Sequence, residues 1–228
     1  MPSIDRLAVL SVILEDGVVP IFTAPDPDVA FDFVAGCAQG GARVVEFTNR
    51  GDFAHATFVE LARRVERELP GVTLGAGTIV DAPTAAMFIA AGARFIVGHA
   101  LVPEVARLCN RRRVAYIPGC GSATEIGQAE ELGCDIVKLF PAAAFDGPGF
   151  VRGILGPSPG TRVMPTNVLA TEDATRAWIL AGAAALGVAG HLYPPELIAF
   201  RDPAEIARRT RQILGWVQDA RAARDARG

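Results

Sequence analysis

Lys138 is the only lysine in this chain of 228 residues, although lysine and arginine together number 22. It lies in an apolar run at positions 136–141, which is more typical of a buried strand than of a charged helix face. Arginine can replace lysine wherever a solvated positive charge is enough, but a guanidinium group does not lose its proton to become a nucleophile. A lysine amine in an apolar setting can do so, and it can then attack a carbonyl carbon to form a Schiff base. Lys138 is therefore the best candidate for covalent chemistry, the alternative being a structural lysine that a general preference for arginine left in place.

Glu46 is a second candidate, because it is a carboxylate inside the apolar run Val-Val-Glu-Phe at positions 44–47. Strand alternation places its side chain on the face opposite Val45 and Phe47. A carboxylate is expensive to bury unless it is paired or has a function. Imine chemistry needs one nucleophile and one group that moves protons between water and substrate, so an inward Glu46 near an inward Lys138 would supply both. The structural alternative is an ion pair between Lys138 and Glu46.

The elements that would hold these side chains alternate between short apolar strands and alanine-rich helices. Strands are predicted at 18–22, 43–47, 72–76, 94–97, 114–117, 135–140, 162–164 and 184–188, roughly one every 20 to 30 residues, which is the size of one βα unit. After an opening helix at 2–14, helices are predicted at 27–39, 54–69, 82–91, 103–112, 124–132 and 172–181. The chain has no Gly-x-Gly-x-x-Gly fingerprint and no break in composition. We therefore predict an α/β fold of the (β/α)8 barrel type, forming one domain over residues 1–228, in preference to a doubly wound sheet.

On such a barrel, the chemistry belongs at the carboxyl ends of the strands. In chain order, the predicted strand ends carry Thr23, Glu46, Thr48, Arg50, Gly77, Thr78, Gly98, His99, Pro118, Gly119, Cys120, Lys138, Phe140, Thr166, Asn167, Gly190 and His191. We therefore expect one site that gathers residues from the whole length of the chain.

Composition argues against several other classes of protein. The formal net charge of −3 gives no basic surface for nucleic acid, and the arginine-rich segment 201–227 alternates with acidic residues and alanine, as in a solvated C-terminal helix. The four cysteines have neither the spacing nor the histidine partners of a zinc site or a disulfide framework, and no metal or cofactor is expected. Free thiols and the lack of a signal peptide predict a cytoplasmic protein. No apolar run is long enough to span a membrane.

Four short segments together form a specific combination. They are Val-Val-Glu-Phe-Thr-Asn-Arg at 44–50, Gly-Ala-Gly-Thr at 75–78, Pro-Gly-Cys at 118–120 and Val-Lys-Leu-Phe-Pro-Ala at 137–142. In this order they resemble the 2-keto-3-deoxy-6-phosphogluconate (KDPG) and 4-hydroxy-2-oxoglutarate (KHG) aldolase family, over most of the chain. The resemblance implies a class I aldolase on a (β/α)8 TIM barrel, usually a homotrimer, that needs no metal. It implies cleavage of a 2-keto-3-deoxy sugar acid, or of 4-hydroxy-2-oxoglutarate, to pyruvate and an aldehyde.

The resemblance also implies roles for individual residues. Lys138 would form the Schiff base with the C2 carbonyl of a 2-oxo acid, and Glu46 would be the general acid/base. Arg50 and Thr78 would hold the carboxylate of the pyruvoyl group, and Phe140 would pack against that group and keep the amine desolvated. On local sequence alone, Arg50 could equally be a surface arginine, and Thr78 could be an N-cap of the helix that follows it.

The sequence departs from the family where its members form a phosphate cradle. Relatives commonly end the seventh strand with Pro-Thr-Gly-Gly and the eighth with Gly-Ser, whereas this chain has Pro-Thr-Asn-Val at 165–168 and Ala-Gly-His at 189–191. Asn167 and Val168 replace glycines that let backbone amides approach a phosphate. We expect the methyl groups of Val168 to occupy the space through which a phosphate would approach those amides. His191 or His99 could restore a donor, or both could be structural. We therefore predict a weaker preference for a phosphorylated substrate than relatives have.

Two functions remain open from the sequence. The first is the lyase, with further substrate contacts from Pro118, Thr166, Asn167, Gly190 and His191. The second is a non-catalytic barrel that binds a 2-oxo acid or a protein partner. The sole lysine, kept together with the candidate acid/base and carboxylate-binding residues, favours the enzyme.

Overall fold

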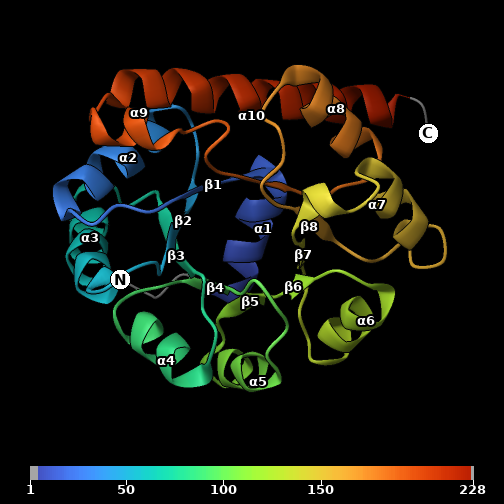
Figure 1. The fold of residues 1–228 in the computed structure, drawn as a ribbon, viewed down its shortest axis with the longest axis horizontal. Coiled ribbons are helices and arrows are strands. Elements are labelled where there is room, and N and C mark those ends of the chain that lie inside the picture. Colours follow the sequence, from blue (N-terminus) through green and yellow to red (C-terminus); the bar gives the residue numbers. More distant parts are fainter. Residues whose placement is uncertain (1–4, 227–228) are drawn as a thin grey trace.

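The computed structural model describes residues 5–226 and shows an α/β barrel, in which a ring of parallel strands is surrounded by helices (Figure 1). The strands are β1 (Val18–Phe22), β2 (Val44–Thr48), β3 (Thr73–Gly77), β4 (Phe95–Val97), β5 (Ala115–Ile117), β6 (Gly119–Cys120), β7 (Val137–Leu139), β8 (Val163–Pro165) and β9 (Leu186–Val188). Each of the eight runs predicted as strands overlaps one of these elements, with ends that differ by at most two residues. The predicted barrel fold is therefore confirmed.

Pro118 interrupts the fifth predicted strand and divides it into β5 and β6. Proline has no N–H to donate to a sheet, but its carbonyl oxygen accepts a hydrogen bond of 2.8 Å from the backbone N–H of Lys138. The strand order is β5-β4-β3-β2-β1-β9 in one sheet and β6-β7-β8 in the other. A bridge between Thr166 and Gly187 joins the end of β8 to β9. The two sheets thus close into one ring, in which β5 and β6 together occupy one of eight strand positions.

The helices surround the ring, except for α1. They are α1 (Arg6–Asp16), α2 (Pro27–Gln39), α3 (Ala54–Glu68), α4 (Ala82–Ala90), α5 (Pro103–Arg112), α6 (Ala123–Glu131), α7 (Pro148–Leu155), α8 (Glu172–Leu180), α9 (Pro195–Ala199) and α10 (Pro203–Asp225). The predicted helices at 27–39 and 103–112 match α2 and α5 at both ends. The opening helix begins at residue 6, and residues 2–4 of the predicted range lie outside the described residues. Helices α7 and α9 were not predicted, because α7 contains two glycines and α9 is a single short turn.

Aspartate side chains fix where two of these helices begin. Asp26 accepts hydrogen bonds from the backbone N–H groups of Asp28 and Val29 at the start of α2. Asp81 accepts a hydrogen bond of 2.7 Å from the backbone N–H of Thr84 at the start of α4. In both helices a proline follows in the first turn, where its missing N–H costs nothing.

Alternation along the strands builds two apolar layers. Val45 on β2 and Val137 on β7 belong to the larger core, which lies between the strands and the surrounding helices. Residues one position earlier, Val44 and Ile136, belong to a second core inside the ring. The side-chain period of two therefore decides which residues face the barrel interior.

Helix α1 closes one end of the barrel. Its residues Val9 and Ile13 belong to the inner core together with Phe95 and Ala115, the first residues of β4 and β5. Those positions mark the amino ends of the strands, and α1 appears within the outline of the ring in Figure 1. The carboxyl ends are therefore the ends at which a site can form.

The long helix α10 crosses the outside of the barrel and packs against α2 and α8 (Figure 1). Arg208 and Arg209 form salt bridges with Glu205 on its surface, as predicted for a solvated helix face, and Arg227 of the predicted segment lies outside the described residues. No helix within residues 5–226 combines the length and apolar composition needed to cross a membrane.

Arg221 ties α10 to the amino end of the barrel. Its partly buried guanidinium donates hydrogen bonds to three backbone carbonyls, those of Leu14, Glu15 and Ala184. A lysine cannot present the same planar fork of donors. We expect Arg221→Lys to lower the free energy of unfolding by about 1–3 kcal/mol, because carbonyls that lose a charged donor lose its stabilisation. Urea denaturation measures this change.

Arg224→Lys is the matched control, since Arg224 donates only to the neighbouring, exposed Asp225 among the described contacts. It should leave the urea midpoint near that of the unmodified protein. An equal loss of unfolding free energy in both variants would contradict the conclusion that the hydrogen bonds of Arg221 hold α10 to the amino end of the barrel.

Candidate active site

Lys138 and Glu46 project into the barrel interior from opposite walls. Glu46 follows Val45 on β2, and Lys138 follows Val137 on β7, and both valines pack into the outer core. Alternation therefore turns the two charged side chains inward, as predicted. Three strand positions separate β2 from β7 in either direction around the closed ring. One acidic and one basic side chain thus enter the same enclosed space.

The carboxylate of Glu46 is completely buried, with an exposed fraction of 0%. Neither of its oxygens has a hydrogen-bond partner among the described residues. Strand β3 leaves room for it at Gly77, where a Cβ would overlap Glu46 Oε1. The second glycine of the Gly-Ala-Gly-Thr segment is therefore required by close approach of the Glu46 carboxylate.

The electrostatic setting of Glu46 combines burial with two nearby cations. Burial raises the pKa of the Glu46 carboxyl above its ordinary value, while the positive charges of Lys138 and Arg50 act to lower it. Between the described residues Lys138 and Glu46 there is no direct salt bridge. The ion pair considered from the sequence is thus absent as a direct contact. A carboxyl with a raised pKa can both hold and release a proton closer to neutral pH.

Lys138 is enclosed by its own strand and the segment that follows it. Its side chain is 6% exposed, and its Nζ lies 5.1 Å from the centroid of the Phe140 ring. The Phe140 ring therefore lies beside the amine. The backbone of Lys138 is fixed by the hydrogen bond to the carbonyl of Pro118. The amine thus sits in a largely apolar setting at the carboxyl end of β7.

Thr78 follows β3 with a positive φ of 60°. This conformation is strained for a β-branched residue, and such strain is commonly found at functional sites. Thr78 is not the N-cap of α4, because Asp81 fills that place. The structural alternative for Thr78 is therefore wrong.

Arg50 lies in the loop after β2 and is exposed, so it is a surface arginine by accessibility. Its charge nevertheless acts on the buried Glu46. It also lines a cavity at the carboxyl ends of β1, β2 and β9. Both observations place Arg50 at the site.

The segment after β8 corrects one expectation. Val168 is 3% exposed and belongs to the outer core, so its methyl groups do not occupy the approach to a phosphate. Asn167 is exposed with a φ of 62°, the left-handed conformation that asparagine tolerates better than most residues. Its backbone N–H donates to the carbonyl of Gly187 at 3.1 Å. Thr166 is buried next to it, and its side chain lies against Gly187.

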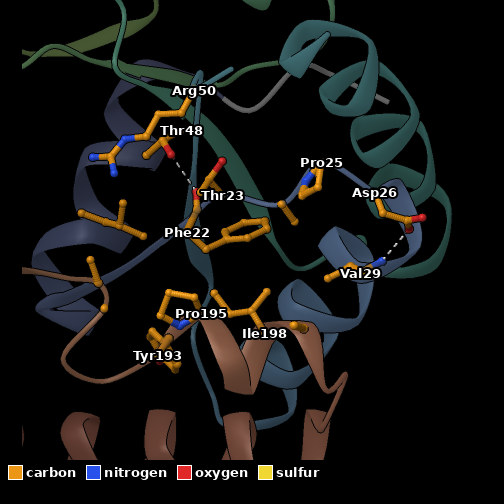
Figure 2. A pocket seen from close by; sticks show the side chains of 15 residues that line it. Phe22, Thr23, Pro25, Asp26, Val29, Thr48, Arg50, Tyr193, Pro195 and Ile198 are labelled. Carbon is orange, nitrogen blue, oxygen red and sulfur yellow. Dashed lines mark hydrogen bonds between the residues drawn. The ribbon is translucent and has the colours of Figure 1, made fainter. Parts of the chain in front are cut away.

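The cavity has a volume of about 440 Å³ and lies between the ends of β1, β2 and β9 on one side and α9 on the other. In Figure 2, Arg50 and Thr48 stand at one end, Phe22 and Thr23 in the middle, and Tyr193, Pro195 and Ile198 at the other. Of the residues predicted at the strand ends, Thr23, Thr48, Arg50 and Gly190 line this cavity. His191 and His99 are exposed and are not among its lining residues.

Sequence reasoning missed most of this cavity. Thr48, predicted at the end of its strand, has the same parity as Glu46 and therefore also faces inward; its hydroxyl donates to the carbonyl of Phe22 at 3.1 Å. Tyr193, Pro195 and Ile198 follow β9 in the region of the unpredicted helix α9. No local signal in the sequence identifies the α9 residues as a wall of the site.

The buried carboxyl predicts a pH-dependent stability. Between its ordinary pKa of 4.5 and the raised pKa of the folded state, Glu46 holds a proton in the folded chain that the unfolded chain has lost, so raising the pH favours unfolding. Glu46→Gln lacks this group. We therefore expect the melting temperature of Glu46→Gln, minus that of the unmodified protein, to increase as the pH rises from 5 to 8. Thermal unfolding at intervals of one pH unit measures the difference.

The exposed Glu60 on α3 supplies the control. Glu60→Gln should follow the unmodified protein over the same pH range. A melting-temperature difference for Glu46→Gln that stays constant with pH would show that burial of this carboxyl does not shift its titration.

The comparisons with known proteins agree with this geometry. The sequence model of the family "KDPG and KHG aldolase" matches residues 9–209. The 2-dehydro-3-deoxy-phosphogluconate aldolase of Treponema pallidum (strain Nichols) is 31% identical over 202 residues, which cover 87% of this chain and 93% of that protein. The KHG/KDPG aldolase of Escherichia coli (strain K12) is 28% identical over 156 residues, which cover 68% of this chain and 71% of that protein.

Solved structures show the same likeness. A crystal structure of a 4-hydroxy-2-oxoglutarate and 2-dehydro-3-deoxyphosphogluconate aldolase superposes with a TM-score of 0.78 at 26% identity, covering 91% of this chain and 98% of that one. The barrel, its inward lysine and glutamate, and the match over most of the sequence lead to one conclusion. This chain belongs to the KDPG and KHG aldolase family of lyases.

Proposed function

We propose that Lys138 is the nucleophile of this class I aldolase. The observation that carries the proposal is the position of the only lysine, inside the barrel opposite the buried Glu46 and beside the Phe140 ring. Its amine adds to the C2 carbonyl of a 2-oxo acid, and loss of water leaves the Schiff base. The C3–C4 bond then breaks, its electrons move toward the imine nitrogen, and an aldehyde departs. Protonation at C3 and hydrolysis release pyruvate and restore the amine.

Glu46 moves the protons in this cycle. It donates a proton as the hydroxyl of the carbinolamine leaves as water, and it accepts the proton of the C4 hydroxyl as the carbon–carbon bond breaks. A group that both donates and accepts works best when its pKa is near the working pH. The raised pKa that burial gives Glu46 supports this role.

Arg50 and Thr78 hold the carboxylate of the 2-oxo acid. Arg50 supplies charge-assisted hydrogen bonds, and its reach toward Glu46 supports a place beside the reacting carbons. The strained backbone of Thr78 follows Gly77, the residue packed on the Glu46 carboxylate. Phe140 covers the pyruvoyl group and keeps water from the amine. The remaining contacts come from Pro118, Thr166, Asn167, Gly190 and His191, which lie at the strand ends around the same mouth.

The substrate is a 2-keto-3-deoxy acid of the KDPG type or 4-hydroxy-2-oxoglutarate. The enzyme acts as one barrel domain in the cytoplasm, which agrees with its four buried, unpaired cysteines. It assembles as a homotrimer, as the family resemblance implies. Sedimentation at equilibrium should then give three times the chain mass of 24.0 kDa.

The Schiff base predicts a covalent adduct at one place. Borohydride treatment in the presence of pyruvate should add one reduced pyruvyl group per chain, located on Lys138. Since the chain has no other lysine, intact mass nearly locates the adduct, and peptide mapping separates it from the terminal amine. Lys138→Arg keeps the charge but not the nucleophile, and it should abolish both adduct and turnover. Normal lyase activity in Lys138→Arg would rule out the imine mechanism.

The acid/base role predicts a different defect for Glu46→Gln. The variant keeps the shape of the side chain but removes the group that titrates, so kcat should fall about 10²–10⁴-fold, the usual worth of a positioned general acid/base. Pyruvate affinity, measured by protection of Lys138 from modification, should change far less. Turnover equal to that of the unmodified enzyme would reduce Glu46 to a structural residue.

A further inference from the structure

The cavity between β1 and α9 lies beside the proposed reaction without enclosing its two reacting groups. Of the residues proposed to act on the substrate, Arg50 and Gly190 line this cavity, whereas Lys138 and Glu46 do not. The far end of a substrate has donors elsewhere, because the backbone N–H groups of residues 168–170 and 190–191 have no acceptor among the described contacts and remain available to an anion. The cavity volume of about 440 Å³ is typical of small-molecule sites. Its lining therefore indicates which other molecule it fits.

The wall away from Arg50 is apolar and partly open to water. It consists of Phe22, Pro25, Val29, Tyr193, Pro195 and Ile198. Val29 and Ile198 are half-buried, and Pro25 and Pro195 are exposed. An apolar group placed on this wall would remove its own surface and that of the wall from water, which is favourable.

Aromatic packing holds this wall in place. The Phe22 ring stacks on Phe33 with centroids 4.2 Å apart, and Phe33 packs edge-on against Tyr193 at 4.9 Å. The Tyr193 hydroxyl is buried 2.7 Å from the Thr210 hydroxyl, so the protein itself satisfies it. The wall is thus preformed, and a ligand would not have to order it.

The polar groups of the lining are mostly in use. The Thr48 hydroxyl donates to the carbonyl of Phe22, and the Asp26 carboxylate accepts from the backbone N–H groups at the start of α2. Thr23 adds an exposed, uncharged hydroxyl. A ligand with several polar groups would therefore leave most of them without a partner in this cavity.

Arg50 supplies the only positive charge among the lining residues described. None of the salt bridges within residues 5–226 includes it. In Figure 2 its guanidinium points away from Pro25 and Asp26, and so away from the one carboxylate of the lining. A guanidinium can donate two parallel hydrogen bonds to a carboxylate. One cation at the end of an apolar surface is the complement of an acid with an apolar tail.

We propose that this cavity binds a monocarboxylic acid with a short apolar tail. Its carboxylate contacts Arg50, and its tail lies between Phe22 and Ile198. Such an acid has no 2-oxo group for Lys138 to attack, so it occupies Arg50 without reacting. It therefore excludes the carboxylate of the 2-oxo acid and inhibits the enzyme competitively. The inhibition rests on the proposed function, in which Arg50 holds that carboxylate.

Titration calorimetry on the unmodified enzyme tests the match between ligand and cavity. Hexanoate carries both the charge and the tail, acetate carries the charge alone, and hexan-1-ol carries the tail alone. We expect hexanoate to bind about 30-fold or more tightly than acetate, because four further carbons are buried. It should bind about tenfold or more tightly than hexan-1-ol, which lacks the charged hydrogen bonds. Hexanoate binding no tighter than either of the other two would overturn the proposal.

A pair of variants locates the tail. Ile198→Asp places a negative charge in the apolar wall, and it should weaken hexanoate binding about tenfold or more. Phe200→Asp adds the same charge just after α9, at a residue that is 81% exposed and outside the cavity lining, and it should leave hexanoate binding unchanged. Equal dissociation constants in the two variants would place the tail elsewhere and overturn the proposal. If circular dichroism shows that Ile198→Asp does not fold, the three ligands on the unmodified enzyme still decide.

Arg50→Gln locates the carboxylate. This variant should lose the preference for hexanoate over hexan-1-ol, because its amide carries no charge. An unchanged preference would show that the acid binds through other donors, such as the free N–H groups of residues 190–191, and would overturn the assignment to Arg50.

The borohydride adduct with pyruvate tests the competition. Hexanoate should raise the pyruvate concentration that gives half-maximal labelling of Lys138, and saturating pyruvate should restore full labelling. Labelling that is insensitive to bound hexanoate would overturn the shared use of Arg50. Absence of any pyruvate adduct without hexanoate would instead overturn the proposed role of Lys138, and the calorimetric result would then still decide whether the acid binds.

Discussion

Burial of the Glu46 carboxylate is the constraint on which the rest of the site depends. Taking a carboxylate out of water is costly, and this one has no hydrogen-bond partner among the described residues. It is retained because β2 pairs with a strand that carries glycine where the carboxylate lies, and because two cations act on it from Lys138 and Arg50. Because burial penalises the ionised form, the pKa of the Glu46 carboxyl is raised above its ordinary value, which is the direction that the proposed acid/base role requires.

The barrel divides stability and chemistry between its two ends. At the amino end, α1 fills the ring with apolar side chains, and Arg221 holds α10 against the end of that helix. At the carboxyl end, the inward positions carry Glu46, Thr48 and Lys138 instead of the apolar residues found closer to α1. A well-packed end therefore supplies the rigidity that lets charged groups remain buried at the other end.

The periodic parts of the sequence were sufficient to predict most of the fold. Strands that alternate around Glu46 and Lys138 and helices that begin at Asp26 or Asp81 lie within one or two residues of their predicted positions. The prediction failed where local signals are weak. Helix α9 is too short to show a period, α7 contains two glycines, and Val168 turns into the core although its neighbours in sequence suggested a site-facing loop.

The sequence by itself singled out Lys138 as the candidate nucleophile, because only lysine can become the amine nucleophile and this chain has one. It also determined that Glu46 shares the barrel interior, since a side-chain period of two leaves no other face for it. Only the tertiary structure decided what lies beyond the reacting carbons. The cavity joins residues of β1 and β2 to residues near 195, and the N-terminus of α2 is closed by its own aspartate. Such contacts depend on how distant segments pack, and no local pattern records them.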